Sequence, residues 1–123
     1  MAWEIPGKMF SLPAAADLSA KQYRFLTGNQ TDGVNVAATG VDVVGVQQNV
    51  PFGVIGEAIT IMADGISKVV CDGNVAKGVA VKVGGSGGAV TATSGTKGVG
   101  IALEDGVVNQ IISVELKDLG TAA

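Results

Sequence analysis

The 123-residue chain contains no histidine, a single cysteine, a single arginine and few aromatic residues. Without histidine, it lacks the commonest general base and metal ligand, and no Ser-His or Cys-His pair can form. A zinc site needs several cysteines or histidines, and Cys71 is the only such residue. One arginine, Arg24, leaves little material for bidentate recognition of phosphates or bases. We therefore expect no metal site and no cofactor.

Charge and hydropathy exclude two further classes of partner. The formal net charge is −3, from eight basic and eleven acidic residues, and no basic cluster exists that would bind nucleic acid. No apolar run approaches the roughly 20 residues that span a bilayer, so no membrane partner is expected. The segment before Ala14-Ala15-Ala16 lacks the apolar stretch of a signal peptide, which favours an unprocessed chain made in the cytoplasm. Cys71 ends an apolar run and is expected to be a buried, inert thiol.

Other patterns that often carry chemistry have ordinary structural explanations here. Residues 84–88, GGSGG, precede a strand-like AVTAT segment, whereas a phosphate-binding loop needs a helix at that point. We interpret this glycine run as a hairpin tip. The carboxylates are scattered, mostly beside glycine or asparagine in turn-like contexts, and nothing selects a catalytic pair or a calcium loop. We therefore predict that the protein is not an enzyme and has no catalytic residues.

The residues that are abundant favour an all-β fold. Valine, alanine and 19 glycines dominate the chain, which suits a small Gly/Val-rich β-barrel or sandwich rather than a helical bundle. Alternation or β-branched composition predicts strands near residues 23–25, 34–37, 41–46, 58–62, 79–83, 90–93, 99–103 and 110–116. Asp64-Gly65, flanked by apolar runs, predicts a tight hairpin between the strands on either side.

Residues 1–18, MAWEIPGKMFSLPAAADL, differ from the rest of the chain. They hold the only tryptophan and two of the three prolines. Proline fixes φ and cannot donate to a β-ladder, so we predict an extended N-terminal arm over 1–18 and a single β domain over 19–123. The arm could cover its own β-body, or its apolar residues could anchor on another subunit, since exposed apolar residues need a partner surface.

The two halves of the chain resemble each other weakly. An Ala-Lys dipeptide occurs at 20 and 76, a valine at 34 and 90, and a Val-Gly-aliphatic triplet at 44 and 99, giving offsets of 56, 56 and 55 residues. Each triplet precedes a loop and an alternating strand. We interpret this as two degenerate copies of one β-unit, each able to bury the apolar face of the other.

Residues 64–116 carry a further resemblance. The segment DGISKVVCDGNVAKGVAVKVGGSGGAVTATSGTKGVGIALEDG, continuing to IISVEL, resembles the head-decoration, or capsid cement, proteins of tailed bacteriophages. The matching features are an AKG turn into an apolar strand, a glycine turn before a short Val-Thr-Ala strand, a VGIALE segment and an alternating last strand. The first half of the chain fits more loosely.

The resemblance implies a virion protein on the outer capsid surface of the expanded bacteriophage head. Such proteins commonly form a homotrimer that clamps neighbouring subunits of the major capsid protein against internal DNA pressure. The arm often makes part of the contact, so capsid or subunit contacts are expected at Trp3, Ile5, Pro6, Phe10 and Leu12. Residues 1–12 would then be removable without unfolding the β-body.

Two other functions remain open at the level of sequence. A soluble ligand- or surface-binding β-module would need exposed aromatic residues on a sheet, and only Trp3 and Tyr23 are candidates for stacking. Another virion component, such as a tail element, would share the β-rich composition. Size in solution would separate a trimer from long tubes.

Overall fold

The computed structural model describes residues 4–29, 33–38, 42–93 and 95–121. These residues form strands and turns with no helix, which confirms the predicted all-β class. The strands are β1 (Ile5–Pro6), β2 (Met9–Pro13), β3 (Phe25–Asn29), β4 (Gly33–Val36), β5 (Gly45–Gln47), β6 (Ala58–Met62), β7 (Gly65–Val70), β8 (Ala80–Val83), β9 (Ala89–Thr91), β10 (Lys97–Ala102) and β11 (Ile111–Thr121).

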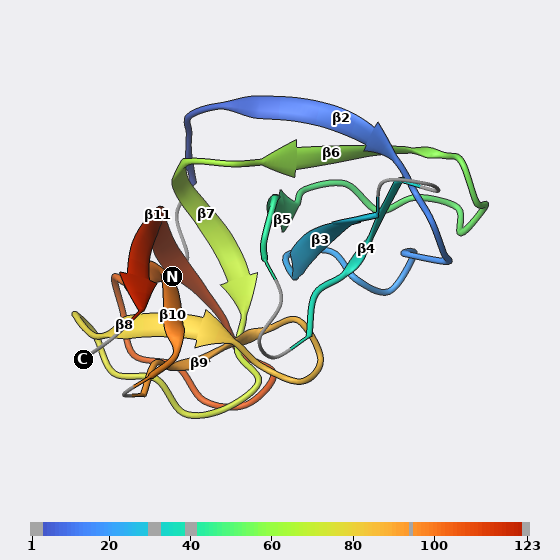
Figure 1. Ribbon diagram of the computed structural model, residues 1–123. Coiled ribbons are helices and arrows are strands. Elements are labelled where there is room, and N and C mark those ends of the chain that lie inside the picture. The colour runs from blue at the N-terminus through green and yellow to red at the C-terminus, as the bar shows by residue number, and fades with distance from the viewer. Residues whose placement is uncertain (1–3, 30–32, 39–41, 94, 122–123) are drawn as a thin grey trace.

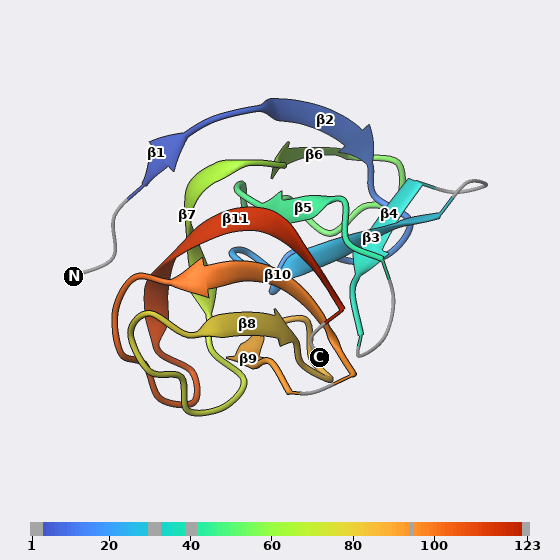
Figure 2. The same ribbon diagram turned by 60° about the vertical axis from the view of Figure 1, so that its left-hand side comes forward.

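The strands build two antiparallel sheets, and apart from β1 the strands of each sheet come from one half of the chain (Figure 1). The first sheet has the order β2-β6-β5-β3-β4, and the second has the order β1-β7-β11-β10-β8-β9. Both views place the blue-to-green first half beside the yellow-to-red second half, with the N-terminal strands along the outside (Figure 2). Neither sheet closes into a barrel within the described ranges, so the fold is the sandwich-like member of the two predicted forms.

The two sheets repeat one five-strand unit. With β1 set aside, β2 to β6 correspond in order to β7 to β11, and the order of neighbours is the same in both sheets. The register agrees as well, because Leu26 pairs with Gly45 and Val81 pairs with Gly100, each residue 55 positions further on. The predicted repeat is therefore present in the structure. Among the sequence matches, the Val-Gly-aliphatic triplets are the pair that occupies equivalent positions in the two units.

The other two sequence matches are one residue out of register. Val34 corresponds to Ala89 rather than to the next valine, because each forms the parallel bridge to the end of the first strand of its unit. Lys21 corresponds to Ala76, since their carbonyls accept equivalent turn bonds from Arg24 and Val79. Chance identity in a Val/Ala-rich sequence shifted the alignment, and the hydrogen bonds correct it.

The glycine of each triplet has a steric cause. A Cβ on Gly100 would lie 2.6 Å from the carbonyl oxygen of Glu115, and a Cβ on Gly45 would collide with the carbonyl oxygen of Met62. Met62 and Glu115 occupy equivalent positions on β6 and β11. The backbones of the paired strands come too close at this point for any side chain.

Two non-glycine residues with positive φ are also explained by the repeat. Tyr23 (φ 63°) corresponds to Gly78 (φ 86°), and Asn109 (φ 70°) corresponds to Gly56 (φ 91°). The predicted strand over 23–25 is wrong for this reason: Tyr23 lies in a left-handed turn, and β3 begins only at Phe25. The repeat fixes the backbone conformation even where one copy has lost the glycine.

Each half encloses an equivalent inner core. The first contains six buried apolar residues whose counterparts in the second half are also buried. The pairs are Ala14 and Cys71, Leu18 and Val75, Leu26 and Val81, Val34 and Ala89, Ile59 and Ile112, and Ile61 and Val114. The opposite face of the first sheet adds Phe25, Val46 and Met62 to the second core. This shared cluster joins the two halves.

The predicted hairpin at Asp64-Gly65 is wrong. β6 and β7 flank this dipeptide but belong to different sheets and do not pair. The chain instead turns a corner, with Gly65 at φ 100° and the Asp64 Oδ1 atom accepting a 2.6 Å hydrogen bond from the Lys8 backbone N–H. The N-terminal strands follow the same corner, so β2 pairs with β6 and β1 pairs with β7.

Candidate interaction surface

The expected contact residues of the N-terminal arm fall into two groups. Ile5 and Pro6 on β1 are exposed, and Ile5 has 56% of its surface accessible. Phe10 and Leu12 alternate inward along β2 and pack half-buried against the first core. Trp3 lies outside the described residues. Of the expected set, the described exposed members are therefore Ile5 and Pro6.

The arm is also more than an appendage in this structure. β2 pairs residue by residue with all of β6, and β1 pairs with the start of β7. Both are edge strands, the position that proline tolerates. Removing residues 1–12 would strip an edge strand from each sheet and uncover the first core. Point substitutions at exposed positions are therefore the better test of a contact role.

A second exposed apolar surface was not among the sequence-based candidates. The loop between β5 and β6 presents Phe52 with 95% of its surface accessible, next to Val54 and Ile55, which are also exposed. Pro51 is buried and anchors the loop. The signal available in the sequence was an apolar cluster, VPFGVI, in a segment that proline and glycine already marked as a loop. Such clusters at the surface commonly mark binding sites.

The carboxylate of Glu57 holds this loop in one conformation. Its Oε2 atom accepts a 2.8 Å hydrogen bond from the Phe52 N–H, and its Oε1 atom accepts bonds from Gly53 and Val54 at 3.1 and 3.2 Å. These bonds, led by that from Phe52, lower the pKa of Glu57 against the opposing effect of burial. The loop is thus a preorganised turn and not a loose connection.

Asp72 organises the glycine run at residues 84–88. Its Oδ2 atom accepts hydrogen bonds from the Ser86 and Gly88 N–H groups at 3.1 and 2.7 Å, and its Oδ1 atom pairs with Arg24 at 3.1 Å. The run does connect the antiparallel strands β8 and β9, which confirms the predicted hairpin tip. Two of its amides are already bound by a carboxylate of the same chain.

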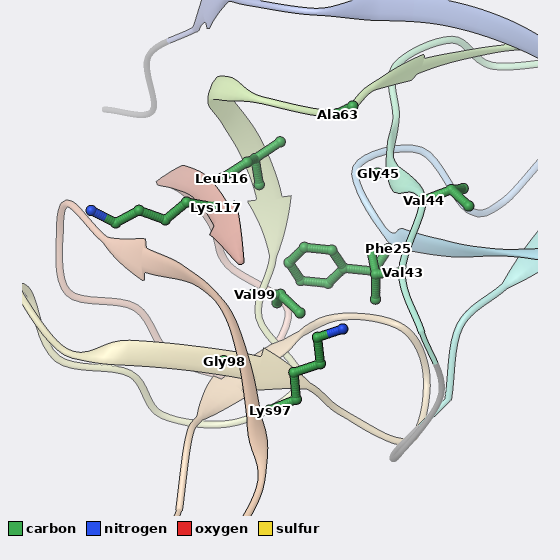
Figure 3. Close-up of a pocket in the computed structure, with 10 residues that line it drawn as sticks. All are labelled: Phe25, Val43, Val44, Gly45, Ala63, Lys97, Gly98, Val99, Leu116 and Lys117. Carbon is green, nitrogen blue, oxygen red and sulfur yellow. The ribbon is translucent and has the colours of Figure 1, made fainter. Parts of the chain in front are cut away.

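A shallow cavity of about 130 Å³ lies where the two halves meet. Figure 3 shows the Phe25 ring between Leu116 and Val99, while the Lys117 side chain points away from the ring. Lys97 pairs with Asp42 at 3.3 Å, and Lys117 pairs with Glu115 at 3.7 Å. The volume is well below the roughly 300 Å³ of small ligand sites. We treat this cavity as a feature of packing between the halves.

The remaining reactive groups are few. Cys71 is buried as predicted, and burial together with the neighbouring Asp72 carboxylate raises the pKa of its thiol. Within the described ranges, no group of three or more His, Cys, Asp or Glu side chains is placed to hold a metal ion. The same ranges include no helix of the length and apolarity that a membrane span requires.

Comparison with solved structures identifies a similarity of fold. No protein-family model matches the chain, and no curated protein matches it. Among solved structures, the chain is similar to the N base of the head fiber gp8.5 of bacteriophage phi29, with a TM-score of 0.70 and 20% sequence identity. The similarity covers 94% of this chain and 98% of that one. At this identity, the comparison establishes a shared fold.

Proposed function

We propose that this protein is a structural component of a tailed-phage virion that binds the outer surface of the expanded head and cements neighbouring major capsid subunits. The observation that carries the proposal is the agreement of fold with the phi29 head-fiber base over nearly the whole of both chains. The likeness of residues 64–116 to capsid cement proteins is a separate line of support. On this proposal, the role of the protein in the virion is structural rather than catalytic.

Cementing needs only differential binding. A protein that binds the expanded lattice, and not its ruptured form, stabilises the lattice by about 2.7 kcal/mol per site at a concentration 100-fold above the Kd. Many copies multiply the effect. A rigid β-body with exposed apolar side chains on fixed loops suits this task, since little conformational entropy is lost on binding.

We further propose that Ile5 and Pro6 contribute to the contact, together with Trp3, and that the protein acts as a homotrimer. β1 presents Ile5 and Pro6 outward at the edge of the second sheet. Phe10 and Leu12 would act indirectly, by holding β2 on the first core. Sedimentation of the free protein, and of protein released from heads, measures the trimer directly.

The test uses expanded heads that lack this protein, purified from the phage that encodes it. Added protein should co-sediment with the heads in a fixed stoichiometry and raise the temperature at which they rupture. An Ile5→Asp variant should bind more weakly, whereas Asn74→Asp, a charge added at an exposed position of the second half, should bind normally. No binding of the wild-type protein, or binding without a change in rupture temperature, would refute the cementing role.

A further inference from the structure

Exposed large hydrophobic side chains concentrate on two loops of the molecule. Apart from Ile5 and Met9, every one found among the described residues lies in the β5–β6 loop or in and just after the β10–β11 loop. The β5–β6 loop carries Val50, Phe52, Val54 and Ile55, and the other segment carries Leu103, Val107, Val108 and Ile111. The two loops connect equivalent strands of the two halves.

The exposed turns of these two loops have the same structure. Val54-Ile55, which we name the first tip, are 63% and 69% exposed, and Val107-Val108, the second tip, are 57% and 54% exposed. In each tip, a side-chain oxygen three residues on accepts a bond from the first valine N–H: Glu57 Oε1 at 3.2 Å and Gln110 Oε1 at 3.1 Å.

The backbone after each tip is anchored in the same way. The Gly56 N–H donates to the Ala14 carbonyl at 2.7 Å, and the Asn109 N–H donates to the Cys71 carbonyl at 2.8 Å at the equivalent place. Ala14 and Cys71 are matching positions of the inner cores. Both tips therefore present two adjacent aliphatic side chains on the same rigid backbone, and a surface that receives one would receive the other.

The charges around the tips indicate the chemistry of that receiving surface. Asp17 and Glu57 flank the first tip, with Lys21 close enough to Asp17 to lower the pKa of its carboxyl, after the larger effect of Ser19 hydrogen bonds. Glu104 and Asp105 flank the second tip, where the Lys77 N–H donates to Asp105 at 2.8 Å. Each tip is thus apolar at its end with a net acidic flank. A second copy of this acidic chain would bring like charges together, so a recess with a basic rim is the better match.

We infer that each tip docks into the same apolar, basic-rimmed recess on two neighbouring copies of one partner protein, so that a single chain bridges two subunits. The β5–β6 loop and the β10–β11 loop, which carry the tips, lie far apart in both views, which allows simultaneous engagement of two partners (Figure 1, Figure 2). The partner is named on the strength of the proposed function: it is the repeating subunit of the head surface. Each tip buries little area alone, and joining two weak sites on one rigid body raises the overall affinity by roughly 100-fold or more.

The test measures binding of tip variants to heads that lack this protein. Ile55→Ser and Val108→Ser should each weaken binding by roughly 100-fold, to similar extents, because each leaves one functional tip. The conservative variants Ile55→Val and Val108→Ile should bind as the wild type does. Both substituted positions carry exposed side chains, and equal melting temperatures of the four variants verify folding.

Isolated, unassembled head subunits provide the monovalent probe. Wild-type protein should bind them with about the affinity that a single-tip variant has for heads. If heads bind the wild type and both serine variants equally, the bridging inference is overturned while the proposed function stays intact. The same conclusion follows if only one of the two serine variants binds more weakly than the wild type. If the wild type itself fails to bind heads, the proposed function fails and the bridging inference with it.

Discussion

Replacement of Asp72 by asparagine should destabilise the protein far more than the same replacement at Asp42. The Asp72 carboxylate accepts hydrogen bonds from the Ser86 and Gly88 N–H groups and from Arg24, at 2.7 to 3.1 Å. The Arg24 and Asp72 side chains are only 18% and 14% exposed. Arg24 belongs to the first half and Asp72 to the second, so the pair also connects the two halves.

The size of the expected loss of stability follows from the number of hydrogen-bond donors that Asp72 accepts from. Asparagine offers one acceptor oxygen in place of two, and its amide group would meet a donor, so at least one of the three partners loses its bond. Hydrogen bonds to charged groups contribute roughly 1.5 to 3 kcal/mol each, and Arg24 also loses its counter-charge in a mostly buried site. We expect a loss of about 3 kcal/mol in the free energy of unfolding. For a chain of this size, that lowers the Tm by about 12 °C.

Urea unfolding and thermal melts of Asp72→Asn and Asp42→Asn provide the measurement. Asp42 also pairs with a lysine, at 3.3 Å, but its side chain is 93% exposed. An exposed pair contributes about 0.2 to 1 kcal/mol, so Asp42→Asn should lower the Tm by at most about 4 °C. Equal losses in the two variants would show that the buried carboxylate does not organise the glycine run, and the reasoning would fail.

Two further predictions concern the β5–β6 loop and the close approach of β10 to β11. The pKa of Glu57 is lowered by the loop amides, so its stabilisation of the loop is complete above the ordinary glutamate value of about 4.3 and is lost as the pH falls through the lower folded-state pKa. The protection of the Phe52 amide against hydrogen exchange, taken relative to the intrinsic rate at each pH, should therefore fall at the acidic end of a titration. Glu57→Gln should remove that pH dependence of protection, and unchanged protection of the wild type in acid would contradict it. Gly100→Ala should cost about 1 to 3 kcal/mol because its Cβ would lie 2.6 Å from a carbonyl oxygen, whereas a Cβ at Gly85 meets nothing within 4 Å. Comparable denaturation midpoints for Gly100→Ala and Gly85→Ala would rule out the close approach of the β10 and β11 backbones at Gly100.

The sequence could predict those features that depend on local patterns. Period-two alternation located the strand Ala58–Met62 at its observed bounds, and the glycine content indicated a turn-rich all-β chain. The Val-Gly-aliphatic triplets revealed the repeat, because a steric requirement for glycine persists in both copies. The absence of catalytic and metal-binding function, which rests on a composition without histidine, stays a prediction.

Only the tertiary structure decided which strands pair and which apolar residues remain exposed. Asp64-Gly65 has the local signature of a hairpin, yet the strands around it find better partners in separate sheets. Phe10 and Phe52 both lie in proline-containing apolar segments, but β2 packs the first, half-buried, against a core while the second remains at the surface. Strand pairing and exposure depend on contacts between residues far apart in the chain, and a local pattern carries no information about those contacts.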